Sequence, residues 1–397
     1  MNFAKRLAVI ETHPIQYHAP VYRVLQQEFG VAVTALYGSD FSVAGYRDAE
    51  FGATFHWDTD LLSGYDAKFL TRVADGGAMN AGGVTARGLA ARLRAVQPDA
   101  VLLVGYSPRF HRDAFLQVWR AGFPRLFRGE TTDHAVTRSP LKKIARDGLL
   151  RVFYARFAAL LYVGARSREH FLRLGVPEAR LFFSPYCVDT TPFQLHKAEH
   201  VTRRDATRHA LGIAPHERVF LFAGKLSPRK APELVLRAVK HFPVTERTQT
   251  HVVFVGDGEL RAALSAFAKE SPCVRAHFVG FQNQTQLSRF YHAADAFVLP
   301  SRAGETWGLV VNEALHHGLR CVVSDRVGCA PDLVIPNETG EIFRAEDVNE
   351  LTRALERVAN ARDENARAQC MARADMYSTR RAAEGIARAF EFVLRQT

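Results

Sequence analysis

Short apolar segments alternate with segments of amphipathic, helical spacing along most of the chain. In the first half, the apolar runs at 6–11, 31–37 and 99–105 have the length of strands, and helical patterns follow over about 20–29 and 110–121. Strands that alternate with helices are typical of a parallel β-sheet covered by helices on both faces. The pattern therefore predicts an α/β fold built on doubly wound parallel sheets.

The alternation is interrupted once, by the polar segment 190–205. This segment contains Pro192 and has no clear strand pattern, so we interpret it as a linker. Strand-like runs and helical segments resume after it and continue to the end of the chain. The pattern thus predicts two Rossmann-like domains facing a central cleft and a terminal helix: residues 1–190, 191–376 and 377–397.

The composition is that of an ordinary globular protein, with 47% apolar and 23% charged residues among 397. No segment approaches the roughly 18 apolar residues that a membrane span needs. The apolar run after Lys5 and Arg6 is too short for a signal peptide. The five cysteines are scattered and form no C-x-x-C pair, which favours a reducing compartment and argues against a zinc site. We therefore expect a cytoplasmic protein without a bound metal.

Basic residues exceed acidic ones by 52 to 41, which gives a net charge of +11. Such a surplus favours an anionic partner: nucleic acid, an acidic membrane surface or a phosphorylated small molecule. The positive charge is spread along the chain, and no RNA-recognition, helix-turn-helix or zinc-finger pattern occurs. We therefore expect no nucleic-acid partner.

Two lysines flank a predicted strand-to-helix turn in the second half. Lys225 follows Gly224 at the end of the run 218–224, and Lys230 lies five residues further on. Two cations at such a turn can both reach one diphosphate. The alternative is a pair of solvated surface lysines. Gly256 ends the next strand-like run in a tight turn, where backbone groups can approach a ligand.

The segment 300–315 combines a helix start with two glutamates. Gly308 opens the predicted helix, whose first amide groups have no intrahelical acceptor and suit a phosphate. Seven residues separate Glu305 from Glu313, which lies inside the helix and suits ribose hydroxyls. The alternatives are a charge that favours the helix dipole for Glu305 and a solvated helix face for Glu313.

These elements together resemble retaining glycosyltransferases of the GT-B fold, specifically glycosyltransferase family 4. The resemblance is clearest over residues 215–335 and looser over the rest of the chain. The matching segments are the GKL…K pair, VGDGEL at 255–260, FVGF at 278–281, YHAADAFVLPS at 291–301, the two glutamates and the Gly328 loop before Asp332. Two positions depart from the family: Lys225 stands where Arg is usual, and Asp332 where Glu is common.

The resemblance implies a nucleotide-sugar donor held by the C-terminal domain and a glycan or lipid-linked acceptor held by the N-terminal domain. It implies that Lys225 and Lys230 bind the diphosphate and that Glu305 contacts the transferred sugar. The donor-binding residues that it implies are Gly224, Gly256, Phe281, Thr306, Trp307, Gly308, Leu309, Val310 and Glu313. Such enzymes usually need no divalent metal or other cofactor, and the terminal helix crosses back onto the N-terminal domain.

The N-terminal half carries two candidate acceptor loops. The loop 11–20 holds His13, Gln16 and His18 at a strand end, where they either contact the acceptor or only hydrogen-bond locally. The family commonly has a catalytic His after the strand that here reads PRLFRGETTDH. Glu130 and His134 are the two candidates for that position, and Arg128 is a weaker one; each is alternatively a loop anchor.

Residues 140–161 have helical apolar spacing and carry five basic side chains against Asp147. One hypothesis is peripheral contact with anionic lipid on the inner face of the membrane. The other is a helix that packs on the sheet with a solvated basic side.

The leading functional hypothesis is a retaining transfer of a hexose-type sugar to a growing glycan or glycolipid, in cell-surface polysaccharide biosynthesis. A sugar-nucleotide epimerase or another enzyme on the same fold is the alternative. The sequence does not reveal the donor nucleotide, the sugar, the acceptor, the linkage or the oligomeric state.

Overall fold

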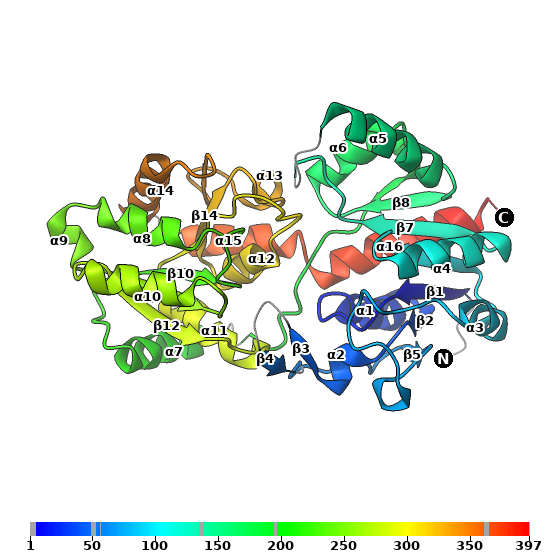
Figure 1. The fold of residues 1–397 in the computed structure, drawn as a ribbon, viewed down its shortest axis with the longest axis horizontal. Coiled ribbons are helices and arrows are strands. Elements are labelled where there is room, and N and C mark those ends of the chain that lie inside the picture. The colour runs from blue at the N-terminus through cyan, green and yellow to red at the C-terminus, as the bar shows by residue number, and fades with distance from the viewer. Residues whose placement is uncertain are drawn as a thin grey trace.

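Each half of the chain forms one parallel sheet with helices on both faces, and the two lobes lie side by side (Figure 1). The computed structural model describes residues 5–48, 53–55, 57–134, 139–193, 197–360 and 365–396. This architecture confirms the predicted α/β, GT-B-like arrangement of two Rossmann-like domains.

The N-terminal sheet has seven strands in the order β5-β2-β1-β6-β7-β8-β9, all parallel. Its strands are β1 Lys5–Glu11, β2 Val31–Tyr37, β5 Asp66–Phe69, β6 Ala100–Val104, β7 Arg125–Gly129, β8 Ala159–Tyr162 and β9 Leu181–Phe183. Its helices are α1 Ala19–Phe29, α2 Phe41–Ala44, α3 Leu89–Val96, α4 Arg109–Arg120, α5 Pro140–Tyr154 and α6 Ala165–Arg173. Between β2 and β5 the chain also forms a short antiparallel hairpin of β3 Tyr46–Asp48 and β4 Ala53–Phe55. Short 3-10 helices cover Val73–Asp75 and Glu178–Arg180.

The C-terminal sheet has six parallel strands in the order β12-β11-β10-β13-β14-β15. Its strands are β10 Arg218–Ala223, β11 Thr250–Val255, β12 Arg275–Gly280, β13 Ala296–Leu299, β14 Arg320–Ser324 and β15 Gly340–Phe343. Its helices are α7 Lys197–Ala210, α8 Glu233–Lys240, α9 Val244–Arg247, α10 Arg261–Glu270, α11 Gln284–Ala293, α12 Leu309–His316, α13 Ala330–Leu333, α14 Val348–Asn360 and α15 Ala366–Asp375.

The central strands are apolar on both faces because each face packs under helices. In β1, Leu7 and Val9 belong to one core and Ala8 and Ile10 to the other, and all four side chains are fully buried. Such continuous apolar runs are typical of parallel strands covered on both sides. The strands therefore end at one shared edge, and the loops that follow them face the other lobe.

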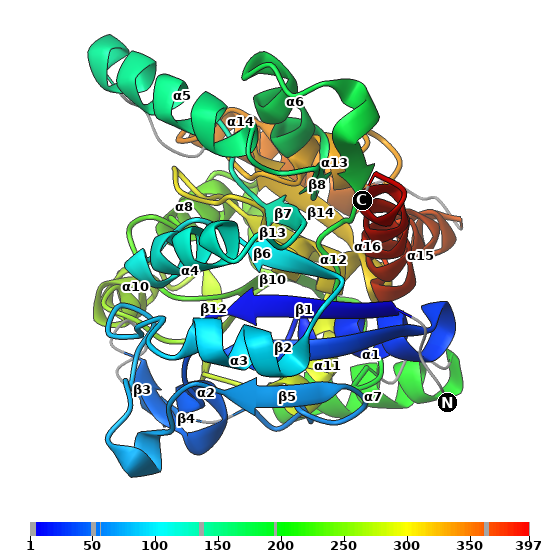
Figure 2. The same cartoon turned by 90° about the vertical axis from the view of Figure 1, so that its right-hand side faces the viewer.

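The last helix, α16 Thr379–Leu394, leaves the C-terminal lobe and packs on the N-terminal one (Figures 1 and 2). Its buried face, including Ile386 and Phe390, completes the core that α1 forms with the sheet. Gly385 allows close packing, since a Cβ atom there would lie 1.8 Å from the carbonyl oxygen of Phe183. The terminal helix thus crosses back as the resemblance implies.

The interpretation of residues 190–205 as a linker is wrong for its second half, because α7 begins at Lys197. This helix is held mainly by polar contacts rather than by an apolar stripe. Arg208 is buried and donates hydrogen bonds to the carbonyl oxygens of Ala293 and Glu217 and to the carboxylate of Asp295. A helix that is anchored by guanidinium groups leaves little apolar periodicity in the sequence.

Within the described ranges, the structure contains no helix that is both long and apolar enough to cross a bilayer.

Candidate functional site

A cavity of about 310 Å³ lies between the lobes at the edge where the strands end. The N-terminal lobe contributes Ile15, Tyr17, His18, Glu130 and Tyr186, and the C-terminal lobe contributes Lys230, Glu305, Thr306, Trp307, Gly308, Leu309 and Val310. Most of the residues that the sequence analysis assigns to phosphate and sugar contacts therefore meet in one space.

Lys230 and Glu305 form an ion pair in the wall of this cavity. Both side chains are nearly buried, and the carboxylate of Glu305 also accepts a hydrogen bond from Ser301 Oγ at 3.2 Å. Arg229 Nη1 lies 3.5 Å from the same carboxylate. The lysine that is predicted to bind diphosphate and the glutamate that is predicted to contact the sugar are thus held against each other.

The loop before α12 is fixed by close backbone packing. Gly308 has a φ of 104°, a conformation that glycine adopts readily, and it caps the start of the helix. Gly328 packs against the loop so closely that a Cβ atom there would lie 1.9 Å from the carbonyl oxygen of Thr306. The indole of Trp307 is buried and donates to Asn312 Oδ1 at 2.8 Å. The first amides of α12 are therefore presented to the cavity on a fixed scaffold.

Glu313 is almost completely buried, so the solvated-face interpretation is wrong. Its carboxylate accepts hydrogen bonds from Tyr291 Oη at 2.8 Å, Gln284 Nε2 at 3.2 Å and Tyr17 Oη at 3.4 Å. Burial raises the pKa of Glu313, while these three donors lower it. Tyr17 lines the cavity, and the Glu313 carboxylate lies behind the Tyr17 hydroxyl.

Four other predicted donor-side residues lie outside the cavity lining. Position 256 has room only for a glycine, since a Cβ atom there would lie 2.0 Å from the carbonyl oxygen of Gly224. Gly224 in turn adjoins the cavity, because a Cβ atom there would lie 4.0 Å from Lys230 Cε. Lys225 is half-buried after β10, and Phe281 is half-buried after β12. The ends of β10 and β11 thus form the floor behind Lys230.

The two N-terminal candidates after β7 are placed differently. Glu130 lines the cavity and accepts a hydrogen bond from Thr306 Oγ1 of the other lobe at 2.9 Å. His134 is exposed and is not part of that lining. Arg128 is buried, donates to the carbonyl oxygen of Pro185 at 2.9 Å and stacks over Tyr186. Glu130 is therefore placed to meet a substrate, whereas Arg128 anchors the loop that carries Tyr186.

The loop after β1 contributes one predicted residue, His18, and two others, Ile15 and Tyr17, to the cavity lining. His18 lines the cavity, with its Nδ1 atom 2.5 Å from the carboxylate of Glu11. His13 is directed to Thr12 Oγ1 at 2.8 Å, and burial lowers its pKa to about 4. Neither His13 nor Gln16 lines the main cavity.

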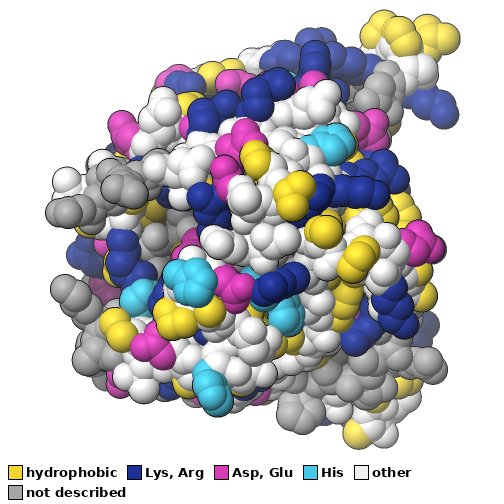
Figure 3. Space-filling view, turned by 90° about the vertical axis from the view of Figure 1, so that its left-hand side faces the viewer, with side chains coloured by type: hydrophobic (Ala, Val, Ile, Leu, Met, Phe, Trp, Pro, Cys, Tyr) yellow, Lys and Arg dark blue, Asp and Glu magenta, His cyan; other side chains and the backbone are white. Residues whose placement is uncertain are grey.

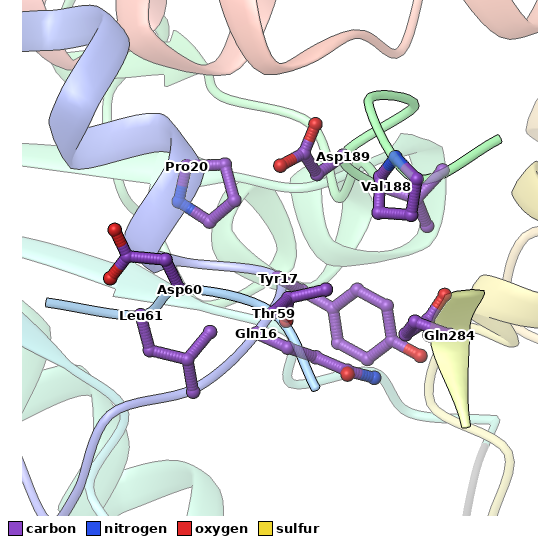
Figure 4. A pocket seen from close by; sticks show the side chains of 10 residues that line it. Gln16, Tyr17, Pro20, Thr59, Asp60, Leu61, Val188, Asp189 and Gln284 are labelled. Atoms are coloured by element: carbon purple, nitrogen blue, oxygen red, sulfur yellow. The ribbon is translucent and has the colours of Figure 1, made fainter. Parts of the chain in front are cut away.

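Tyr17 was not predicted, although it is the residue of this loop with the most cross-lobe contact. It lines the main cavity and also a smaller hollow of about 20 Å³, which Figure 4 shows from close by. The smaller hollow is lined by Gln16, Tyr17, Pro20, Thr59, Asp60, Leu61, Val188, Asp189, Pro192 and Gln284. The Tyr17 ring therefore separates the two spaces and points its hydroxyl toward Gln284 and Glu313.

Within the described ranges, no three or more His, Cys, Asp or Glu side chains are grouped so that they could hold a metal ion.

Comparison with known proteins places the C-terminal lobe in a family. Residues 203–375 match the family model of glycosyl transferases group 1. This segment confirms the resemblance for the C-terminal domain.

Two curated relatives match part of the chain. D-inositol 3-phosphate glycosyltransferase of Mycobacterium ulcerans is 34% identical over 160 residues, which cover 38% of this chain and 33% of that protein. Lipopolysaccharide 1,2-N-acetylglucosaminetransferase of Salmonella typhimurium is 32% identical over 168 residues, which cover 38% of this chain and 43% of that protein. The chain thus aligns with well under two thirds of either relative.

A solved structure matches both lobes. The structure of Anabaena HepE in complex with UDP and glucose superposes with a TM-score of 0.69 at 14% sequence identity. The superposition covers 98% of this chain and 99% of the HepE chain. At this identity the likeness supports the fold of the whole chain and no more.

Proposed function

We propose, on the premise that residues 203–375 form a glycosyl transferases group 1 domain, that this chain transfers a sugar from a nucleoside-diphosphate sugar to a glycan or lipid-linked acceptor. We further propose that the transfer retains the anomeric configuration and needs no divalent metal. The single observation that carries the proposal is the convergence of Lys230, Glu305 and the start of α12 on one interlobe cavity.

The C-terminal wall of the cavity suits the leaving diphosphate. The Lys230 ammonium and the first amides of α12 would supply positive potential without a metal in the cavity between the lobes. Donors that are already fixed in place need no reorganisation as charge develops on the leaving group. Lys225, which is half-buried at the end of β10, supports this potential from behind.

The remaining groups suit the sugar and the nucleoside. Glu305 is held next to Lys230, so a sugar attached to the bound diphosphate would lie beside its carboxylate. Glu313 would hold the ribose hydroxyls, and the backbone after β12 near Phe281 would meet the base. Glu130 and His18, which line the cavity from the other lobe, would contact the acceptor. Binding and orientation of the two substrates then supply most of the rate.

The similar proteins described above favour particular substrates. The HepE structure contains UDP and glucose, and one relative is named for lipopolysaccharide glycosylation. We therefore propose a UDP-sugar as the first donor to test and a role in cell-surface polysaccharide assembly. The scattered cysteines favour a cytoplasmic location for that role.

Substitution of Lys230 tests the proposal. We expect Lys230→Ala to lower nucleoside-diphosphate release from the preferred nucleotide sugar by about 100-fold, the usual cost of one electrostatic donor. The matched control is Lys269→Ala, which removes an exposed lysine from α10 and should leave the rate unchanged. A wild-type rate in the Lys230 variant, or no turnover of any nucleotide sugar by the wild type, would contradict the proposal.

A further inference from the structure

Helix α5 presents a row of large apolar side chains to solvent. Leu141, Ile144, Leu149 and Val152 have 80%, 70%, 74% and 61% of their surface exposed. Side chains of this type rarely gather on the outside of a globular protein, and an exposed apolar patch usually marks a surface that contacts a partner or a membrane. The first turns of α5 project from the body at the upper left of Figure 2.

The exposed row is one stripe of an amphipathic helix. Residues 141, 145, 148 and 152 follow one another at helical spacing. At 3.6 residues per turn, Lys142 and Arg151 fall on opposite edges of this stripe. The opposite side of the helix carries Leu150 and Tyr154, which are buried in the core of the lobe. One side of α5 thus packs in the core, as the second hypothesis for residues 140–161 expects, and the other side is exposed.

A hollow of about 610 Å³ continues the apolar stripe toward α4. It is lined by Phe115, Trp119, Ala145, Gly148, Leu149, Val152, Phe153 and Arg156. The Trp119 ring is 44% exposed and stacks with Phe115 and under the guanidinium of Arg156. An aromatic ring with an adjacent cation is typical of side chains at the boundary between lipid and water.

The charge around this surface is positive. Lys142, Lys143 and Arg151 of α5, Arg156 just after this helix and Arg120 of α4 are all exposed. The acidic neighbours are already paired: Asp147 is buried against Arg173, and Asp113 lies 3.3 Å from Arg109. Dark-blue and yellow side chains accordingly gather on the projecting corner at the upper right of Figure 3.

We propose that the face formed by α4 and α5 inserts into an anionic lipid bilayer. The apolar stripe and the hollow would take up acyl chains, and the flanking lysines and arginines would pair with phosphate groups of the lipids. The exposed aliphatic side chains match the apolar interior of a bilayer, and the cations on both edges match its anionic lipid head groups. A protein partner that buried the same stripe would also have to neutralise these cations.

The placement of this face relative to the cavity follows from the topology. Helices α4 and α5 begin at the edge of the sheet where β6 and β7 end, which is the edge that faces the cavity. Two of the exposed residues, Leu141 and Ile144, lie in the first two turns of α5. A bilayer bound here would thus lie next to the cleft mouth and could present a membrane-borne molecule to it.

Vesicle flotation of the full chain tests the proposal. We expect the wild type to float with vesicles of phosphatidylcholine and phosphatidylglycerol, more weakly with phosphatidylcholine alone, and less as salt is added. The variant Ile144→Asp/Leu149→Asp should lose at least about tenfold in vesicle affinity. Lys142→Glu/Lys143→Glu should lose about twentyfold, with a weaker dependence on salt.

The control variant is Val244→Asp on α9, which changes an equally exposed apolar residue of the other lobe and should float like the wild type. All substituted side chains are exposed, so circular dichroism should show unchanged folding. The assay contains no sugar donor, so its outcome is independent of the proposed transfer. Absence of flotation with anionic vesicles would overturn the proposal, as would a dimer in light scattering that Ile144→Asp/Leu149→Asp converts to monomer.

Discussion

Tyr17 shows how a single hydroxyl can link the two lobes at the candidate site. It comes from the loop after β1, yet it donates a hydrogen bond to Glu313, which is buried inside α12. Burial and the nearby carboxylate raise the pKa of Tyr17 well above its usual value, so the phenol stays protonated as a donor. If Glu313 holds the ribose, the Tyr17 hydroxyl occupies a position that a ribose hydroxyl would need.

We expect Tyr17→Phe to bind nucleoside diphosphates about threefold to tenfold more tightly than the wild type, because one competing hydrogen bond is removed. Thermal-shift titration with UDP and GDP measures this change as a larger stabilisation at equal ligand concentration. The matched control is Tyr162→Phe, which changes a half-buried tyrosine at the end of β8. Weaker binding in the Tyr17 variant would show instead that this hydroxyl contacts the donor.

Sequence reasoning reaches the residues of the C-terminal half better than those of the N-terminal half. Lys230 follows β10, and Glu305 and Gly308 follow β13, the neighbouring parallel strand, so the strand pattern already predicts that they share one edge of the sheet. The partner of Tyr17 lies 296 positions away, and no local pattern reports such a contact. The same limit applies to Glu130, whose hydrogen bond to Thr306 spans 176 positions.

At the scale of elements, histidines join α7 to α11 and α11 to the end of α12. His200 Nδ1 lies 2.7 Å from His292 Nδ1, and Ser288 Oγ lies 2.7 Å from His317 Nε2. Burial, followed by the charges of Arg367 and Arg204, lowers the pKa of His200 from 6.5 to about 4. The neutral imidazole is therefore the form that suits the folded protein.

We expect the free energy of unfolding to fall as the pH drops from 6.5 to about 4, since the unfolded chain takes up the His200 proton first. His200→Gln should remove about 1 kcal/mol of this loss, a value reduced for the partial exposure of the ring. Urea unfolding across this pH range measures the slope, and His209→Gln, exposed on the same helix, is the control. An unchanged slope in the His200 variant would exclude His200 as a cause.

The helices and strands that the sequence predicts well are those with strong apolar periodicity. Helix α4, for example, is predicted over about 110–121 and is found at Arg109–Arg120. Helix α7 was missed because arginine side chains that bond to backbone carbonyls, rather than an apolar stripe, attach it to α11. The exposed side of α5 shows the opposite limit: helical spacing identified its apolar residues but could not tell which of them the core leaves uncovered.

At the scale of the molecule, the lobes touch closely on the side of α6. Gly164 leaves room for the Trp307 ring, and the next amide, of Ala165, donates to Asp332 Oδ1 at 2.9 Å. Asp332 also accepts a hydrogen bond from Tyr377 Oη at 3.0 Å, just before the chain enters α16. The same residues therefore hold the two lobes together and fix the position of the Trp307 loop.

We expect Gly164→Ala to separate the lobes, because the new Cβ atom would lie 2.3 Å from the Trp307 ring. Small-angle scattering should show a larger radius of gyration, and turnover of the nucleotide sugar should fall at least about tenfold as the cavity loses its shape. The control is Gly148→Ala, where a Cβ atom would meet nothing within 4 Å. Unchanged scattering and turnover in the Gly164 variant would show that this contact does not set the lobe arrangement.

The return of α16 to the first lobe also orders events during translation. Ile386 and Phe390 fill the core around α1, so the N-terminal sheet emerges from the ribosome without one wall of its interior. The lobe that is synthesised first can be completed only after residues 379–394 have been made. Until then its uncovered strands depend on the second lobe to fold quickly, or on chaperones to shield them.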